Sequence, residues 1–92
     1  MIANHIELSA EIGRLFTFEH GNIPNPKALA GITLLTIVMT SMTTDRSALH
    51  ALLTNPSQLE ADRQMLLPAE QPDMLKLRHI AALAVENILH RN

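Results

Sequence analysis

The sequence contains no cysteine, no tryptophan and no tyrosine, and its 92 residues include only two phenylalanines and three glycines. Without cysteine the chain has neither disulfide bonds nor thiolate metal ligands. The three glycines are isolated from one another, so there is no glycine-rich phosphate-binding loop. Charge is also sparse, with 17% of residues charged and a net charge of −2 at pH 7. A chain without a basic excess is poorly suited to bind nucleic acid or an anionic membrane surface.

Aliphatic residues dominate what is present. Hydrophobic residues make up 47% of the chain, and most are Leu, Ile, Ala and Met, which favour helices over sheets. A single domain of this size, residues 1–92, buries only roughly 60–65% of its unfolded surface. A second copy of the chain is the simplest cover for the excess apolar surface. We therefore expect an all-α fold, a small helical bundle of about four to five helices that is completed by dimerisation.

Capping residues and prolines divide the chain into predicted helices. Asn4 with Glu7 forms a capping box, and Gly21 suits the end of the first helix. A second capping box at Ser57–Glu60 follows the Asn-Pro pair that ends the third helix. Pro24 and Pro26 break the chain before the second helix, and Pro68 ends the fourth. The predicted helices are Ile6–Glu19, Pro26–Met42, a short helix that starts at Thr43, Thr44 or Asp45 and runs to about Leu53, Ser57–Leu67 and Pro72–His90.

The longest stretch without charge, Ala28–Thr44, is the predicted centre of the fold. It is shorter than the ~20 apolar residues of a membrane span. Because it is apolar nearly all round, we expect it to be buried on most sides. Thr33, Thr36 and Thr40 form a stripe of small residues, and Gly31 adds to it, so another helix can approach closely there. That neighbour is the last helix of the same chain, its copy in a dimer, or a client protein.

The last predicted helix has one broad apolar face, with two exceptions. The apolar face consists of Met74, Leu77, Ile80, Ala81, Ala84, Val85, Ile88 and Leu89. Leu83 lies within the polar face, and Arg78 lies within the apolar face. An arginine in that position extends its charged end to solvent or pairs with an acid. The predicted interaction residues of the chain are Gly31, Thr33, Thr36, Met39, Thr40, Arg78 and Leu83.

Neither catalysis nor metal binding is indicated by local motifs. Asp45, Ser47 and His50 are close in sequence, but on a helix they point in different directions. No His-x-x-x-His pair occurs. His79 and His90 share a helix face, yet three turns separate them by roughly 16 Å. We expect no enzyme activity, no cofactor and no metal ion.

Methionine and histidine each leave two interpretations open. Met39, Met42, Met65 and Met74 line an adaptable binding groove or, more commonly, fill a core. The five histidines are ordinary surface residues or respond to acid, since their full protonation moves the net charge from −2 to +3.

One part of the chain is spaced like a helix-turn-helix, with a helix over residues 46–53, a turn over 54–57 and a second helix over 58–67. The second helix would read DNA with residues such as Arg63, but it also carries Glu60 and Asp62, which repel phosphates. We favour the interpretation that these are two packed helices of a bundle.

Three segments resemble the small enterobacterial regulators of the AriR (YmgB) type. They are Leu15-Phe16 followed by Gly21-Asn22, the uncharged helix leading into Thr44-Asp45-Arg46-Ser47-Ala48-Leu49-His50-Ala51-Leu52-Leu53, and Asp73-Met74-Leu75-Lys76 with Ile80 and Glu86-Asn87-Ile88-Leu89-His90-Arg91. The three segments cover about two-thirds of the chain and occur in the same order as in the family. The chain departs from the family pattern at residues 24–26 and in an added segment around residues 56–72. The resemblance implies a homodimeric helical regulator of biofilm and acid-stress responses that acts through signalling partners or DNA, and it carries no catalytic residues.

The predicted function is that of a small regulatory or connector protein that binds another protein, such as a signalling component, as a homodimer. The first alternative is a secretion chaperone or anti-adaptor that covers an apolar client segment. The second alternative is a dimeric DNA-binding regulator. Residues 1–7 lack the basic and apolar segments of a signal peptide, so we expect a cytoplasmic protein without a membrane partner. The family resemblance implies that it is bacterial.

Overall fold

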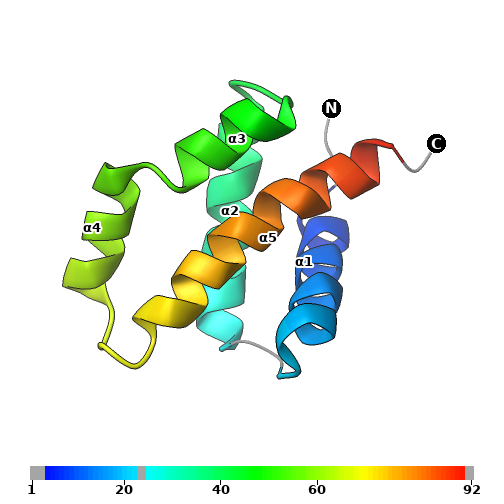
Figure 1. The fold of residues 1–92 in the computed structure, drawn as a ribbon. Helices are drawn as coiled ribbons and strands as arrows, with labels where there is room; N and C mark the ends of the chain where they lie inside the picture. The colour runs from blue at the N-terminus through cyan, green and yellow to red at the C-terminus, as the bar shows by residue number, and fades with distance from the viewer. Residues whose placement is uncertain (1–3, 23–24, 91–92) are drawn as a thin grey trace.

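The last helix of the chain packs against all the others. A computed structural model of the protein describes residues 4–22 and 25–90, which form helices and no strand. The helices are α1 (His5–His20), α2 (Pro26–Thr40), α3 (Arg46–Leu53), α4 (Pro56–Met65) and α5 (Gln71–Leu89). In Figure 1, α5 crosses in front of α2, with α1 on one side and α4 on the other. The described residues therefore confirm the predicted all-α fold.

Capping side chains begin and end the helices where the sequence predicts. Oδ1 of Asn4 accepts a hydrogen bond from the backbone N–H of Glu7 at 2.7 Å, at the start of α1. Gly21 follows α1 with φ 84°, a left-handed conformation that glycine adopts without strain. Asp45 caps α3 by accepting from the N–H of Ala48 at 3.0 Å. The ends predicted at Asn4 and Gly21 are confirmed, and of the three starts predicted for the third helix the structure selects Asp45.

The predicted start of α4 is wrong. The residue that caps α4 is Asn55, whose Oδ1 accepts from the N–H of Ser57 at 2.8 Å. Pro56 then occupies the first turn, where its missing N–H costs nothing. Ser57 and Glu60 thus lie inside the helix and do not form a capping box. The helix also ends at Met65, two residues earlier than predicted.

The end of α2 also lies two residues before the predicted one. The hydroxyl groups of Thr40 and Ser41 donate to the carbonyls of Ile37 and Val38, at 2.7 and 2.6 Å. These i−3 contacts accompany a tightened last turn, which ends the regular helix. Pro24, part of the break predicted before α2, lies outside the described residues.

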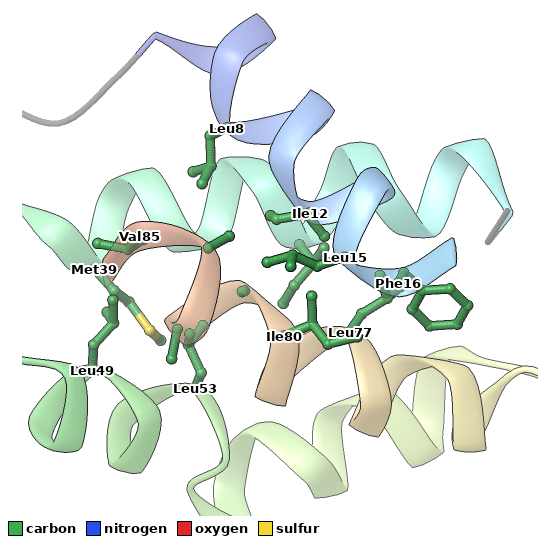
Figure 2. Packing of buried hydrophobic residues seen from close by; sticks show 14 of the residues in the cluster. Leu8, Ile12, Leu15, Phe16, Met39, Leu49, Leu53, Leu77, Ile80 and Val85 are labelled. Atoms are coloured by element: carbon green, nitrogen blue, oxygen red, sulfur yellow. The ribbon is translucent and has the colours of Figure 1, made fainter. Parts of the chain in front are cut away.

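The core takes side chains from α1, α2, α3 and α5, as Figure 2 shows. Half of its buried residues belong to α5, more than to any other helix, and there the small side chains of Ala81, Ala82 and Ala84 let neighbouring helices approach from several directions. The helix that organises the fold is therefore α5, and the expectation that the uncharged helix does so is wrong. Leu89, predicted on the apolar face, is 37% exposed in the last turn.

One side of α2 is buried and the other is open. Thr33 and Thr36 are completely buried, and their hydroxyls donate to the carbonyls of Leu29 and Ile32 at 2.7 and 2.6 Å. On the opposite side, Leu34 is 57% exposed and Val38 is 63% exposed. The expectation that α2 is buried on most sides is therefore wrong.

The molecule measures 39 × 27 × 18 Å, so it is about two helix diameters thick. A layer that thin leaves part of most helices exposed. Among the described residues, no helix combines the length and the apolar character needed to cross a membrane.

Candidate protein-binding groove

A groove of about 540 Å³ lies between α2 on one side and α4 with the start of α5 on the other. It exists because α4 packs mainly against α5 and contributes no buried residue, so α4 stands away from α2 (Figure 1). The α2 side is formed by Asn25, Lys27, Ala28, Gly31, Ile32 and Leu35. The opposite side is formed by Asp62, Met65, Leu66, Ala69, Glu70, Asp73, Met74 and Arg78. The lining is thus mostly aliphatic, with charged residues from both sides.

The charge of Arg78 is fully paired at the base of the groove. Its Nε and Nη2 donate to the two carboxylate oxygens of Asp62 at 2.6 and 2.8 Å. Its Nη1 donates to the backbone carbonyl of Leu53 at 2.9 Å. One buried guanidinium therefore connects α5, α4 and the end of α3. Of the two predicted arrangements for this arginine, extension to solvent or pairing with an acid, the structure shows the second, and the contact joins the two helices on one side of the groove.

The other charged residues of the groove leave an acidic balance. Lys27 lies on the α2 side, whereas Glu70 and Asp73 lie across from it. Glu70 accepts a hydrogen bond from the N–H of Leu67 at 3.0 Å, which fixes the loop before α5. No arrangement of nucleophile, base and oxyanion donors accompanies these residues in the described lining.

The groove continues onto the open side of α2. Gly31 lines the groove and is itself exposed, and an added Cβ there would meet nothing within 4 Å. One turn on lies the exposed side chain of Leu34 and two turns on that of Val38, and Met42 after the helix is 70% exposed. We call the surface of Ala30, Gly31, Leu34 and Val38, together with Met42 in the turn that follows the helix, the open face of α2. It carries no charged residue.

The structure separates the predicted interaction residues into different environments. Thr33, Thr36 and Met39 are buried within the chain, and Thr40 is half-buried. Because Gly31 lies on the other side of α2, it does not belong to the threonine stripe. The neighbours of that stripe are helices of the same chain, since α2 packs against α1, α3 and α5.

A second, smaller hollow of about 390 Å³ lies where α1, α3 and α5 meet. The half-buried Leu83 lines it, together with His50 and His79. Nε2 of His50 lies 2.6 Å from Nδ1 of His79, so one ring donates a hydrogen bond to the other. Partial burial, and then the repulsion from His50, lower the pKa of His79 below its ordinary value.

Sequence reasoning missed the open face of α2 and the histidine pair. The open face had a signal, because Ala30, Leu34, Val38 and Met42 recur every four residues. The histidine pair had none, since its members are 29 residues apart on different helices. Of the four methionines for which a groove or a core was predicted, Met65 and Met74 line the groove, Met39 and Met74 belong to the core, and Met42 is exposed.

Comparison of the chain with protein-family models, with curated protein sequences and with solved structures finds no match in any of the three.

Proposed function

We propose that this chain is a small regulatory or connector protein that acts by binding another protein and that works as a homodimer. The observation that carries the proposal is the continuity of the aliphatic groove with the uncharged open face of α2. Contiguous exposed apolar surface of this kind marks interaction sites in small proteins. The resemblance to AriR-type regulators supports the same function.

Two parts of this surface suit two kinds of contact. The open face of α2 is a straight, uncharged strip with glycine and alanine at one end, which suits close packing against the same helix of a second copy. The groove suits an amphipathic helix of a partner, because its lining is aliphatic and charged residues flank it. The exposed Met65, on α4, adapts its shape to such a partner.

Analytical ultracentrifugation tests the homodimer. We expect the wild-type chain to sediment as a dimer and the double variant Leu34→Glu/Val38→Glu to sediment as a monomer with an unchanged helical circular dichroism spectrum. The matched control is Phe18→Glu, because Phe18 is 84% exposed on α1 and is not part of the open face. A wild-type monomer at high concentration, or a dimer that survives the double variant, would refute the homodimer.

Pull-down from the native cell tests partner binding by the groove. We expect the wild-type chain to retain a signalling component and Met65→Glu to lose it, while Phe18→Glu retains it. Capture of a secreted protein through the same groove would instead favour the secretion chaperone or anti-adaptor, which the aliphatic lining also suits. Equal capture by the wild-type chain and Met65→Glu would remove the groove from the proposal.

The DNA-binding alternative is less well supported by the charges of α4. Arg63 forms an ion pair with Glu60, and Asp62 is engaged with Arg78. These pairs leave the helix without a basic surface for phosphates. A gel shift at physiological salt tests this alternative, and the absence of a shift at micromolar protein would exclude it.

A further inference from the structure

Two histidine rings from different helices meet at the interface of α3 and α5. Besides the 2.6 Å separation of their nitrogens, the ring centroids of His50 and His79 are 4.6 Å apart and the ring planes are tilted by 45°. Leu49 and Leu53, both completely buried, hold α3 in place independently of the rings. We propose that His50 and His79 form a binding site for a late first-row divalent metal ion, such as Zn²⁺, Ni²⁺ or Cu²⁺.

The separation of the two nitrogens is close to that of two ligands on one ion. Metal–imidazole bonds are about 2.0–2.1 Å long, so two ligands at angles between about 90° and 110° have nitrogens roughly 2.9–3.4 Å apart. The pair must therefore open by less than about 1 Å from its hydrogen-bonded separation. Because His79 is exposed and His50 is half-buried, small ring rotations supply that change. An ion would then replace the shared proton between the rings.

The surrounding charges permit a cation at neutral pH. Arg46, which also lines the hollow, forms an ion pair with Glu86 at 3.3 Å. Lys76 and Glu19 line the same hollow with opposite charges, and His20 lies there as well. Metal binding requires neutral imidazoles, so the site is expected to bind more tightly at pH 7.5 than in acid.

Ligand type selects the class of ion. Imidazole nitrogen suits zinc, copper and nickel, whereas magnesium and calcium prefer oxygen ligands. Among the described residues, no group of three or more His, Cys, Asp and Glu side chains is placed to hold one ion. Water therefore completes the coordination, and the site is an open one that joins α3 to α5.

Isothermal titration calorimetry at pH 7.5 with zinc, nickel and copper chloride tests the site. We expect one ion per chain for the wild type, and affinity at least tenfold lower for His50→Ala and for His79→Ala. The matched control is His90→Ala, because His90 is an exposed histidine just after α5 and does not line the hollow. This control is expected to bind as the wild type does.

Two further measurements keep the test independent of folding. Circular dichroism checks that each variant is helical, and His79→Gln replaces His79→Ala if the alanine variant unfolds. In NMR spectra of the wild type, zinc is expected to shift the ring C–H signals of His50 and His79 more than those of the other histidines. The absence of saturable binding up to millimolar metal would overturn the proposal, as would unchanged affinity in both pair variants.

Discussion

The guanidinium of Arg78 and the carboxylate of Asp62 meet side on, with two parallel hydrogen bonds of 2.6 and 2.8 Å. The side chain of Arg78 is 4% exposed, whereas that of Asp62 is 14% exposed. When one partner is removed, water therefore reaches a remaining Asp62 more readily than a remaining Arg78. The loss of stability is therefore expected to be larger when Asp62 is removed than when Arg78 is removed.

Asp62→Ala is expected to lower the free energy of unfolding by about 3–5 kcal/mol, because it leaves a buried charge without its partner. Arg78→Met is expected to cost less, since Asp62 on the outer helix turns toward water. Urea denaturation followed by circular dichroism measures both changes. The control is Glu60→Ala, which breaks an exposed pair and is expected to change stability by less than about 1 kcal/mol. A cost for Asp62→Ala no larger than that of the control would contradict the prediction.

Substitutions of Gly31 are expected to separate stability from association. Gly31→Ala raises the free energy of unfolding by about 0.5–1 kcal/mol, because a helical glycine is replaced at a position with open space around it. Gly31→Leu is expected to fold equally well but to weaken dimerisation, because its side chain holds a second helix away. Thermal unfolding and sedimentation measure the two effects. Unchanged dimerisation by Gly31→Leu would show that the partner helix does not approach there.

The two faces of α2 are expected to respond differently to loss of side-chain volume. Ile32 is 1% exposed, so Ile32→Ala is expected to cost about 2–5 kcal/mol by leaving a cavity. Leu34 is 57% exposed, and Leu34→Ala is expected to cost less than about 1 kcal/mol in the monomer. Urea denaturation at low protein concentration compares them. Similar costs at both positions would mean that the assigned orientation of α2 is incorrect.

The start of α4 is tested by two neighbouring residues. Asn55→Ala is expected to cost about 1 kcal/mol, because it removes the side-chain acceptor for the N–H of Ser57. Ser57→Ala is expected to be nearly neutral, since Ser57 lies within the helix and its side chain does not cap it. Thermal unfolding of the two variants compares the costs. The opposite ranking would restore the capping box that the sequence pattern indicates.

Acid is expected to weaken the fold through His79. Because its pKa is lowered in the folded state, the unfolded chain takes up this proton first as the pH falls. The free energy of unfolding is therefore unaffected by this group well above pH 6.5 and decreases as the pH falls below about 6.5.

The environment of His79 explains the direction of that change. Partial burial of the ring comes first, and the repulsion from His50 adds to it. Urea denaturation at pH 7.5 and pH 5 is expected to show a larger loss for the wild type than for His79→Gln. Equal losses would assign the acid sensitivity to the other histidines.

The features that the sequence predicts correctly are local ones. Asn4, Gly21 and Asp45 specify helix ends because their capping partners lie within four residues. The orientation of α2 was not predictable in the same way. A helix that is apolar nearly all round has no preferred inward side, so only its neighbours decide that Thr33 is buried and Leu34 is exposed.

The candidate sites depend on contacts that are distant in sequence. Arg78 in an apolar stripe predicts a paired charge, but its partner lies 16 residues away on a helix whose orientation the pattern does not specify. The two histidines are 29 residues apart. The periodicity of apolar residues shows which side of a single helix is apolar. Both sites form where two helices pack together, which that periodicity does not predict.

One wall of the groove, α4, contributes no buried residue and packs mainly against α5. Its opening by local unfolding therefore requires less free energy than opening of the core helices, and its amide hydrogens are expected to exchange with solvent first. A partner that fills the groove would slow that exchange by binding only the closed arrangement. Part of the binding free energy would then be used to order α4, so the affinity for a partner would depend on how stable this one helix is.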